Sequence, residues 1–115
     1  MHFSMKQSNF IHKRLDLIKK LISIPSTSDH PENRQKVLEV ACEPLKGFYI
    51  KSFLKDGVPS VIVSNQNQIP DKFKIILNAH LDVVPGQPEQ FKPYEQDGKL
   101  WGRGAADMKS QAAVL

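Results

Sequence analysis

An α/β fold is predicted for this chain of 115 residues, with helices flanking a mixed β-sheet. Two amphipathic helix patterns come first, three β-rich runs follow, and a last helical pattern ends the sequence. The most apolar run, residues 74–79, is expected to be the central strand, because a strand buried on both faces is apolar throughout. The length allows one small domain.

The first helix pattern ends before Pro25, because the residue that precedes a proline avoids helical backbone angles. Ser4 and Ser8 are alternative N-caps. The apolar face has mostly helical spacing and comprises Phe10, Ile11, Leu15, Leu17, Ile18, Leu21, Ile22 and Ile24. The polar residues 26–28 are interpreted as a turn with no part in any chemistry.

A second helix is expected to begin with Pro31 in its first turn, where the fixed φ of proline is favourable. Its apolar face comprises Val37, Leu38, Ala41 and Leu45. Pro44 should end or kink this helix near Glu43, and Gly47 is a stop signal.

Strand signals follow the second helix. Residues 48–54 alternate and are rich in β-formers, and Asp56 with Gly57 supplies turn chemistry. A second run covers residues 60–65, and the third is the apolar run 74–79.

The chain beyond these strands is expected to be irregular but ordered. Residues 85–93 hold three prolines, residues 98–101 resemble a short strand, and residues 108–115 form a plausible helix. Trp101 has two readings, as the lining of a cleft or as core filling. Arg103 lies between two glycines and is expected to brace the loop by hydrogen bonds.

Composition argues against membrane and disulfide-rich classes. No apolar run approaches the roughly 20 residues that span a bilayer, and residues 1–9 lack the apolar core of a signal peptide. Cys42 is the one cysteine, so an internal disulfide is excluded. A reducing cytoplasm is therefore the expected location.

The net charge of +4 raises the question of nucleic-acid binding. The first sixty residues hold ten Lys or Arg against six Asp or Glu, and the remainder holds six of each. Lys13, Arg14, Lys19 and Lys20 recur opposite the apolar face of the first helix, as on a solvated surface. Because no aromatic residues interleave with them, we expect no nucleic-acid partner.

His80 and Asp82 follow the most apolar run, two positions apart, so both project to the same side of an extended chain. A neutral imidazole binds zinc well, and a carboxylate often orients such a ligand. Asp107 begins the last helix after a glycine-rich bend and offers a further carboxylate. Spacing alone favours the plainer alternative, a hydrogen-bonded turn at His80 and an N-cap at Asp107.

The blocks HLDVVP and FKPYEQDGKLWGRGAADMKSQ closely resemble the co-catalytic metallopeptidases of the aminoacylase, acetylornithine deacetylase, succinyl-diaminopimelate desuccinylase and carboxypeptidase G family. The early segment LISIPSTS is also similar to that family. Ser110 departs from the pattern, since glycine usually follows D-M-K there.

The resemblance implies residue roles. His80 would bind one of two divalent metal ions, Asp107 would bridge both, and Asp82 would act in catalysis by orienting His80. The peptide bond between Asp107 and Met108 would be cis. Zinc is the expected metal, with cobalt or manganese as alternatives.

The resemblance also implies the activity, a two-metal hydrolase that cleaves an amide bond in N-acyl amino acids or small peptides with metal-activated water. Its small-molecule substrate would be its main partner, with a homodimer as one option for the full-length protein.

Because the family needs a downstream Glu-Glu pair and a late His, residues 1–115 are expected to be a partial catalytic domain truncated within a helix, inactive alone. The alternative is a non-catalytic α/β remnant or partner-binding module.

Overall fold

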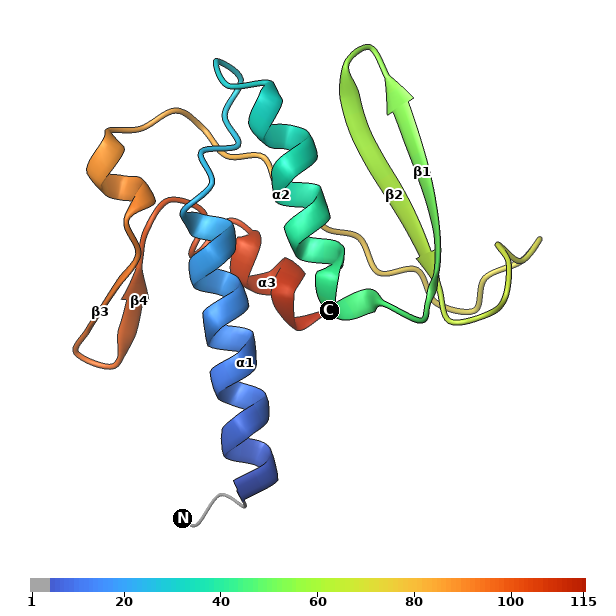
Figure 1. The fold of residues 1–115 in the computed structure, drawn as a ribbon, viewed down its shortest axis with the longest axis horizontal. Helices are drawn as coiled ribbons and strands as arrows, with labels where there is room; N and C mark the ends of the chain where they lie inside the picture. The colour runs from blue at the N-terminus through green and yellow to red at the C-terminus, as the bar shows by residue number, and fades with distance from the viewer. Residues whose placement is uncertain (1–4) are drawn as a thin grey trace.

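The computed structural model describes residues 5–115 and confirms the α/β class (Figure 1). Helices and two small antiparallel sheets make up the fold. The elements are α1 (Met5–Ile22), α2 (Glu32–Cys42), the 3₁₀ turn η1 (Glu43–Leu45), β1 (Tyr49–Lys55), β2 (Val58–Ser64), the 3₁₀ turn η2 (Pro88–Phe91), β3 (Tyr94–Gln96), β4 (Lys99–Trp101) and α3 (Lys109–Val114).

The core lies where α1 meets α2 and α3 (Figure 1). Its buried residues are Leu17, Leu21, Ile24, Val37 and Ala113. Both predicted helix ends are confirmed, because α1 stops at Ile22, ahead of Pro25, and α2 gives way to a 3₁₀ turn at Glu43. Ser8 lies inside α1 and is no N-cap, and Ser4 lies outside the described residues.

Each antiparallel sheet is a β-hairpin whose two strands are joined by a two-residue turn. Strands β1 and β2 pair from Tyr49 with Ser64 to Lys55 with Val58. Both central residues of each turn have positive φ. The values are 51° at Asp56 and 76° at Gly57 in the first hairpin, and 53° at Asp97 and 70° at Gly98 in the second. Asp-Gly favours this geometry, since glycine tolerates positive φ and aspartate does so better than most residues.

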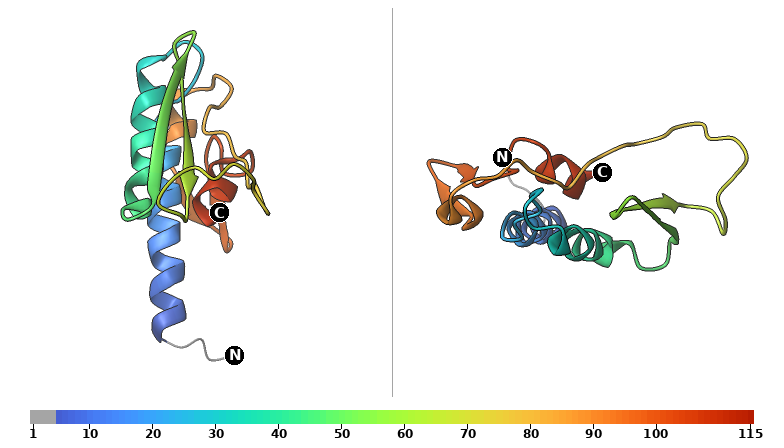
Figure 2. Two further views of the ribbon diagram at one scale, coloured as in Figure 1. Left: turned by 90° about the vertical axis from the view of Figure 1, so that its right-hand side faces the viewer. Right: turned by 90° about the horizontal axis from the view of Figure 1, so that it is seen from above.

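The prediction that residues 74–79 form a central strand is wrong. They run extended without a strand partner among the described residues, and no mixed sheet forms there (Figure 2). Ile75, Ile76 and Leu77 are 78%, 72% and 64% exposed. Apolar composition favours an extended backbone, but a strand also needs a neighbour to accept its hydrogen bonds.

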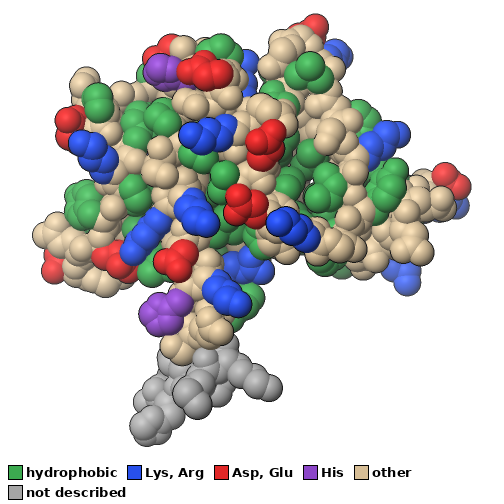
Figure 3. Space-filling view, viewed as in Figure 1, with side chains coloured by type: hydrophobic (Ala, Val, Ile, Leu, Met, Phe, Trp, Pro, Cys, Tyr) green, Lys and Arg blue, Asp and Glu red, His purple; other side chains and the backbone are tan. Residues whose placement is uncertain are grey.

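On the face of α1 that was predicted to be solvated, Lys13 and Lys20 are exposed, whereas Arg14 and Lys19 are half-buried. Figure 3 shows basic side chains along α1. Lys19 pairs with Glu95 at 2.9 Å between Nζ and Oε2. None of the helices in the described part of the chain has the length and apolar character needed to cross a membrane.

Candidate metal centre

The backbone around His80 is fixed by hydrogen bonds to the turn after α1. The Ser26 hydroxyl donates to the carbonyl of Leu81 over 2.6 Å, and the Val83 N–H donates to the Ser26 carbonyl over 3.1 Å. Val83 is buried, whereas His80 and Asp82 are exposed. The apolar side chain therefore anchors this segment and leaves the polar ones in an open site.

The second half of the site is the loop before α3. Gly104 has a φ of +88°, and a Cβ there would lie 2.9 Å from both Lys109 Cδ and Val83 Cγ1. Only glycine fits such a position without a shift. The Lys109 N–H donates to the Gly104 carbonyl over 2.9 Å, and the Asp107–Met108 peptide bond is cis, as the resemblance implied.

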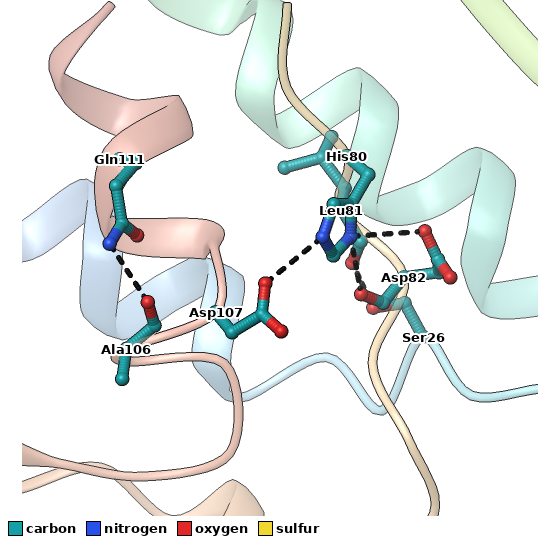
Figure 4. A network of polar contacts seen from close by, with 7 residues as sticks. All are labelled: Ser26, His80, Leu81, Asp82, Ala106, Asp107 and Gln111. Carbon is teal, nitrogen blue, oxygen red and sulfur yellow. Dashed lines mark hydrogen bonds and ion pairs between the residues drawn. The ribbon is translucent and has the colours of Figure 1, made fainter.

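The imidazole of His80 lies between two aspartates (Figure 4). Its Nε2 is 3.1 Å from Asp107 Oδ1. Its Nδ1 is 3.1 Å from the Asp82 carbonyl oxygen and 3.2 Å from Asp82 Oδ1. The two halves of the site, 27 residues apart in sequence, thus meet at one ring.

The alternative reading of Asp107 as an N-cap is wrong. Met108 occupies the N-cap position of α3 and makes no side-chain capping bond, while the Asp107 carboxylate faces His80. The turn-like contact between His80 and Asp82 does form, and the contact of Nδ1 with Asp82 Oδ1 is also the one that an orienting carboxylate would make.

The environment raises the pKa of His80 above its ordinary value. Partial burial of the ring acts in the opposite direction, but hydrogen bonds to the Asp82 carbonyl and to Asp107, together with the charges of both aspartates, outweigh it. A protonated ring donates to both sides, whereas a neutral ring carries one proton, either on Nδ1 toward Asp82 or on Nε2 toward Asp107.

These atoms fit a metal ion as a partial ligand set. Two ligand atoms of a tetrahedral zinc lie about 3.3–3.6 Å apart, given bonds of about 2.0–2.2 Å, and His80 Nε2 and Asp107 Oδ1 are slightly closer, at 3.1 Å. Their side chains are 48% and 85% exposed, so a metal can reach them. Within residues 5–115, however, no three His, Cys, Asp or Glu side chains converge as one ligand group.

An open pocket of about 280 Å³ surrounds the site. His80, Asp82, Asp107 and Arg103 line it. Trp101 is not among its lining residues and is half-exposed, stacked on Tyr94 with ring centroids 6.3 Å apart. Neither reading of Trp101, as cleft lining or as core filling, describes this placement.

Three residues, Arg103, Ser26 and Lys109, hold the backbone around the site by hydrogen bonds. Arg103 braces the loop as expected, because its Nη2 donates to Gln90 Oε1 over 3.0 Å. The contributions of Ser26 and of the fully buried Lys109 were missed. Their partners are backbone carbonyls distant in sequence, and no spacing pattern signals such contacts.

Comparison with known proteins covers the same residues. The model of the peptidase family M20/M25/M40 matches residues 76–115. The chain is 34% identical over 107 residues to the succinyl-diaminopimelate desuccinylase of Bordetella avium, covering 88% of this chain and 27% of that protein.

Two further succinyl-diaminopimelate desuccinylases are similar. The one from Janthinobacterium is 36% identical over 109 residues, and the one from Nitratiruptor is 35% identical over 105. Each alignment covers 28% of the relative, so the chain spans a little over a quarter of the length of these proteins.

Proposed function

Because residues 76–115 match the model of the peptidase family M20/M25/M40 and include His80 and Asp107, we propose that this chain is part of a metal-dependent hydrolase of that family. The reaction is cleavage of an amide bond in an N-acyl amino acid or small peptide. The contact between His80 Nε2 and Asp107 Oδ1, made within the matched residues, is the observation that carries the proposal.

We assign the metal ligands to His80 and Asp107, with two divalent ions, most simply zinc, and cobalt or manganese as substitutes. A bound divalent ion lowers the pKa of a water and polarises a carbonyl oxygen. Asp82, 3.2 Å from His80 Nδ1, would accept the Nδ1–H and so leave the Nε2 lone pair free for a metal ion held on the Asp107 side. Asp107 offers two carboxylate oxygens, so one group can serve two ions.

Further ligands and a general base must come from outside the described residues. A zinc site uses about three or four protein ligands, and here two side chains face each other. We therefore propose that residues 1–115 form part of a catalytic domain and are inactive by themselves. A cytoplasmic location and a homodimer remain parts of this proposal.

The names of the relatives direct the choice of substrate. All three compared proteins are succinyl-diaminopimelate desuccinylases. N-succinyl-diaminopimelate is the first compound to test, followed by N-acetyl amino acids and dipeptides.

The test is an assay of the full protein for release of the free amine, with metal content measured on the same preparation. Chelation should abolish turnover, and added zinc or cobalt should restore it. Metal-free turnover, or stoichiometric metal with no turnover on any N-acyl substrate, would contradict the proposal. The second outcome would favour the alternative, a non-catalytic module, which the incomplete ligand set within residues 5–115 supports.

A further inference from the structure

One short segment, residues 21–26, touches both halves of the candidate metal centre. It comprises the last residues of α1 and the turn that follows. We propose that this segment is a platform that sets the spacing between His80 and Asp107, with Ser26 and Lys109 as positioning residues. The inference rests on the proposed function only in supposing that this spacing serves a metal.

Ser26 fastens the half of the site that carries His80. The side chain is fully buried, and its hydroxyl donates to Leu81 O over 2.6 Å, while its own carbonyl accepts the Val83 N–H. Leu81 lies between His80 and Asp82, as Figure 4 shows. The hydroxyl and the carbonyl of Ser26 therefore hold the backbone of residues 81–83 at two points. These two hydrogen bonds fix the direction in which the exposed side chains of His80 and Asp82 project.

Lys109 fastens the other half. Its side chain is fully buried, and Nζ donates to Leu21 O and to Ile24 O, each over 2.7 Å. Leu21 lies in the last turn of α1 and Ile24 lies two residues beyond its end, which is a region where a cation is favoured. Lys109 follows Asp107 by two positions, so the ammonium ties the Asp107 loop to the helix end.

The two attachments converge from distant parts of the chain. Ser26 and Leu81 are 55 residues apart, and Lys109 and Leu21 are 88 apart. Neither Ser26 nor Lys109 lines the pocket, so neither is placed to touch a substrate. Metal–ligand distances normally stay within about 0.2 Å of their ordinary values. Loss of either attachment should therefore lower the affinity of the site for a metal ion.

The decisive comparison is Ser26→Ala against Ser23→Ala in the full protein. Ser23 lies in the same segment but is a matched control for the Ser26 contact, because its exposed hydroxyl also donates to a backbone carbonyl, Lys20 O over 2.7 Å, and contacts neither half of the site. Ser26→Ala should weaken zinc binding about 10-fold and alter the visible spectrum of the cobalt-loaded protein, as supporting residues of metal ligands typically do. Ser23→Ala should change neither.

A metal-free readout separates this inference from the proposed function. At a fixed pH, the ring nitrogen resonances of His80 should move in Ser26→Ala and stay in place in Ser23→Ala, and amide exchange at Val83 should accelerate only in the first variant. Lys109→Gln, which keeps an N–H donor, should disturb the cobalt spectrum less than Lys109→Met. Lack of any metal binding by the wild type would overturn the function but leave the resonance test standing. Unchanged His80 resonances in Ser26→Ala, or equal changes in both serine variants, would overturn the platform.

Discussion

At the scale of single residues, the chemistry converges on His80. Its two ring nitrogens each face an aspartate, Asp82 on one side and Asp107 on the other. The other histidine paired within the described residues, His30, contacts Glu32 on the surface at 3.1 Å. That pair provides a control for any effect of removing an imidazole.

We expect His80→Ala to abolish metal binding and turnover of the full protein, because it removes the only nitrogen ligand assigned here. His30→Ala should retain both. Metal analysis and the deacylation assay on each variant check this. Full metal content and activity in His80→Ala would refute the assignment.

The affinity for zinc should depend on pH through His80. Although partial burial opposes it, contacts with Asp82 and Asp107 raise the pKa of the ring, and a metal binds only the neutral form. Affinity should therefore be level above the raised pKa and fall about tenfold per pH unit below it. Calorimetric titrations across the pH range, compared with the His80 titration in the metal-free protein, test the coincidence of the two inflections.

Asp82→Asn should lower turnover about 10–100-fold while metal content falls much less, because the role proposed for Asp82 is to hold the ring and not to bind the metal. It should also lower the pKa of His80, since the Asp82 charge is one of the causes that raise it. Kinetics and metal analysis on one preparation decide the matter. A variant that purifies without metal would instead identify Asp82 as a ligand.

At the scale of elements, the glycine-rich loop joins the site to α1. Gly104 approaches Lys109 and Val83 closely, whereas Gly98, in the β3–β4 turn, also has positive φ but has open space around it. The two positions share the backbone requirement and differ in crowding. Comparing alanine substitutions at Gly104 and Gly98 therefore separates the energetic cost of backbone strain from the cost of steric clash.

Gly104→Ala should destabilise the fold by about 1–3 kcal/mol, because backbone strain at positive φ adds to the clash with its neighbours. Gly98→Ala should cost clearly less, since strain acts alone there. Chemical denaturation of both variants measures the difference. Equal losses would show that the crowding at Gly104 relaxes without cost.

At the scale of the whole molecule, apolar side chains are divided between a small core and an exposed extended segment. Leu17 is 8% exposed in the core, while Ile75 and Ile76 are 78% and 72% exposed. Contiguous exposed apolar groups favour self-association.

In the purified chain of residues 1–115, Ile75→Ser with Ile76→Ser should reduce concentration-dependent light scattering and barely change the melting temperature, because little packing is lost. Leu17→Ala should instead cost about 2–5 kcal/mol. Cooperative unfolding weakened by the double serine variant would show that these isoleucines are packed in solution.

Local sequence patterns predicted the helices and the first hairpin, and they also named the candidate site residues, whose roles stay a prediction. Prolines and Asp-Gly pairs act on the backbone within a few residues, so the ends of α1 and α2 and the β1–β2 turn could be predicted locally. The spacing of His80 and Asp82 and the blocks around Asp107 were likewise readable.

How these segments pack against one another could not be predicted from local sequence. Residues 74–79 were predicted as a strand but lack a partner, because strand pairing depends on what lies alongside and not on composition. The contacts that build the site join residues far apart in sequence. His80 and Asp107 are 27 positions apart, Ser26 and Leu81 are 55 apart, and Lys109 and Leu21 are 88 apart. Such contacts follow from packing against α1, and the local pattern that predicts a helix or a turn carries no information about them.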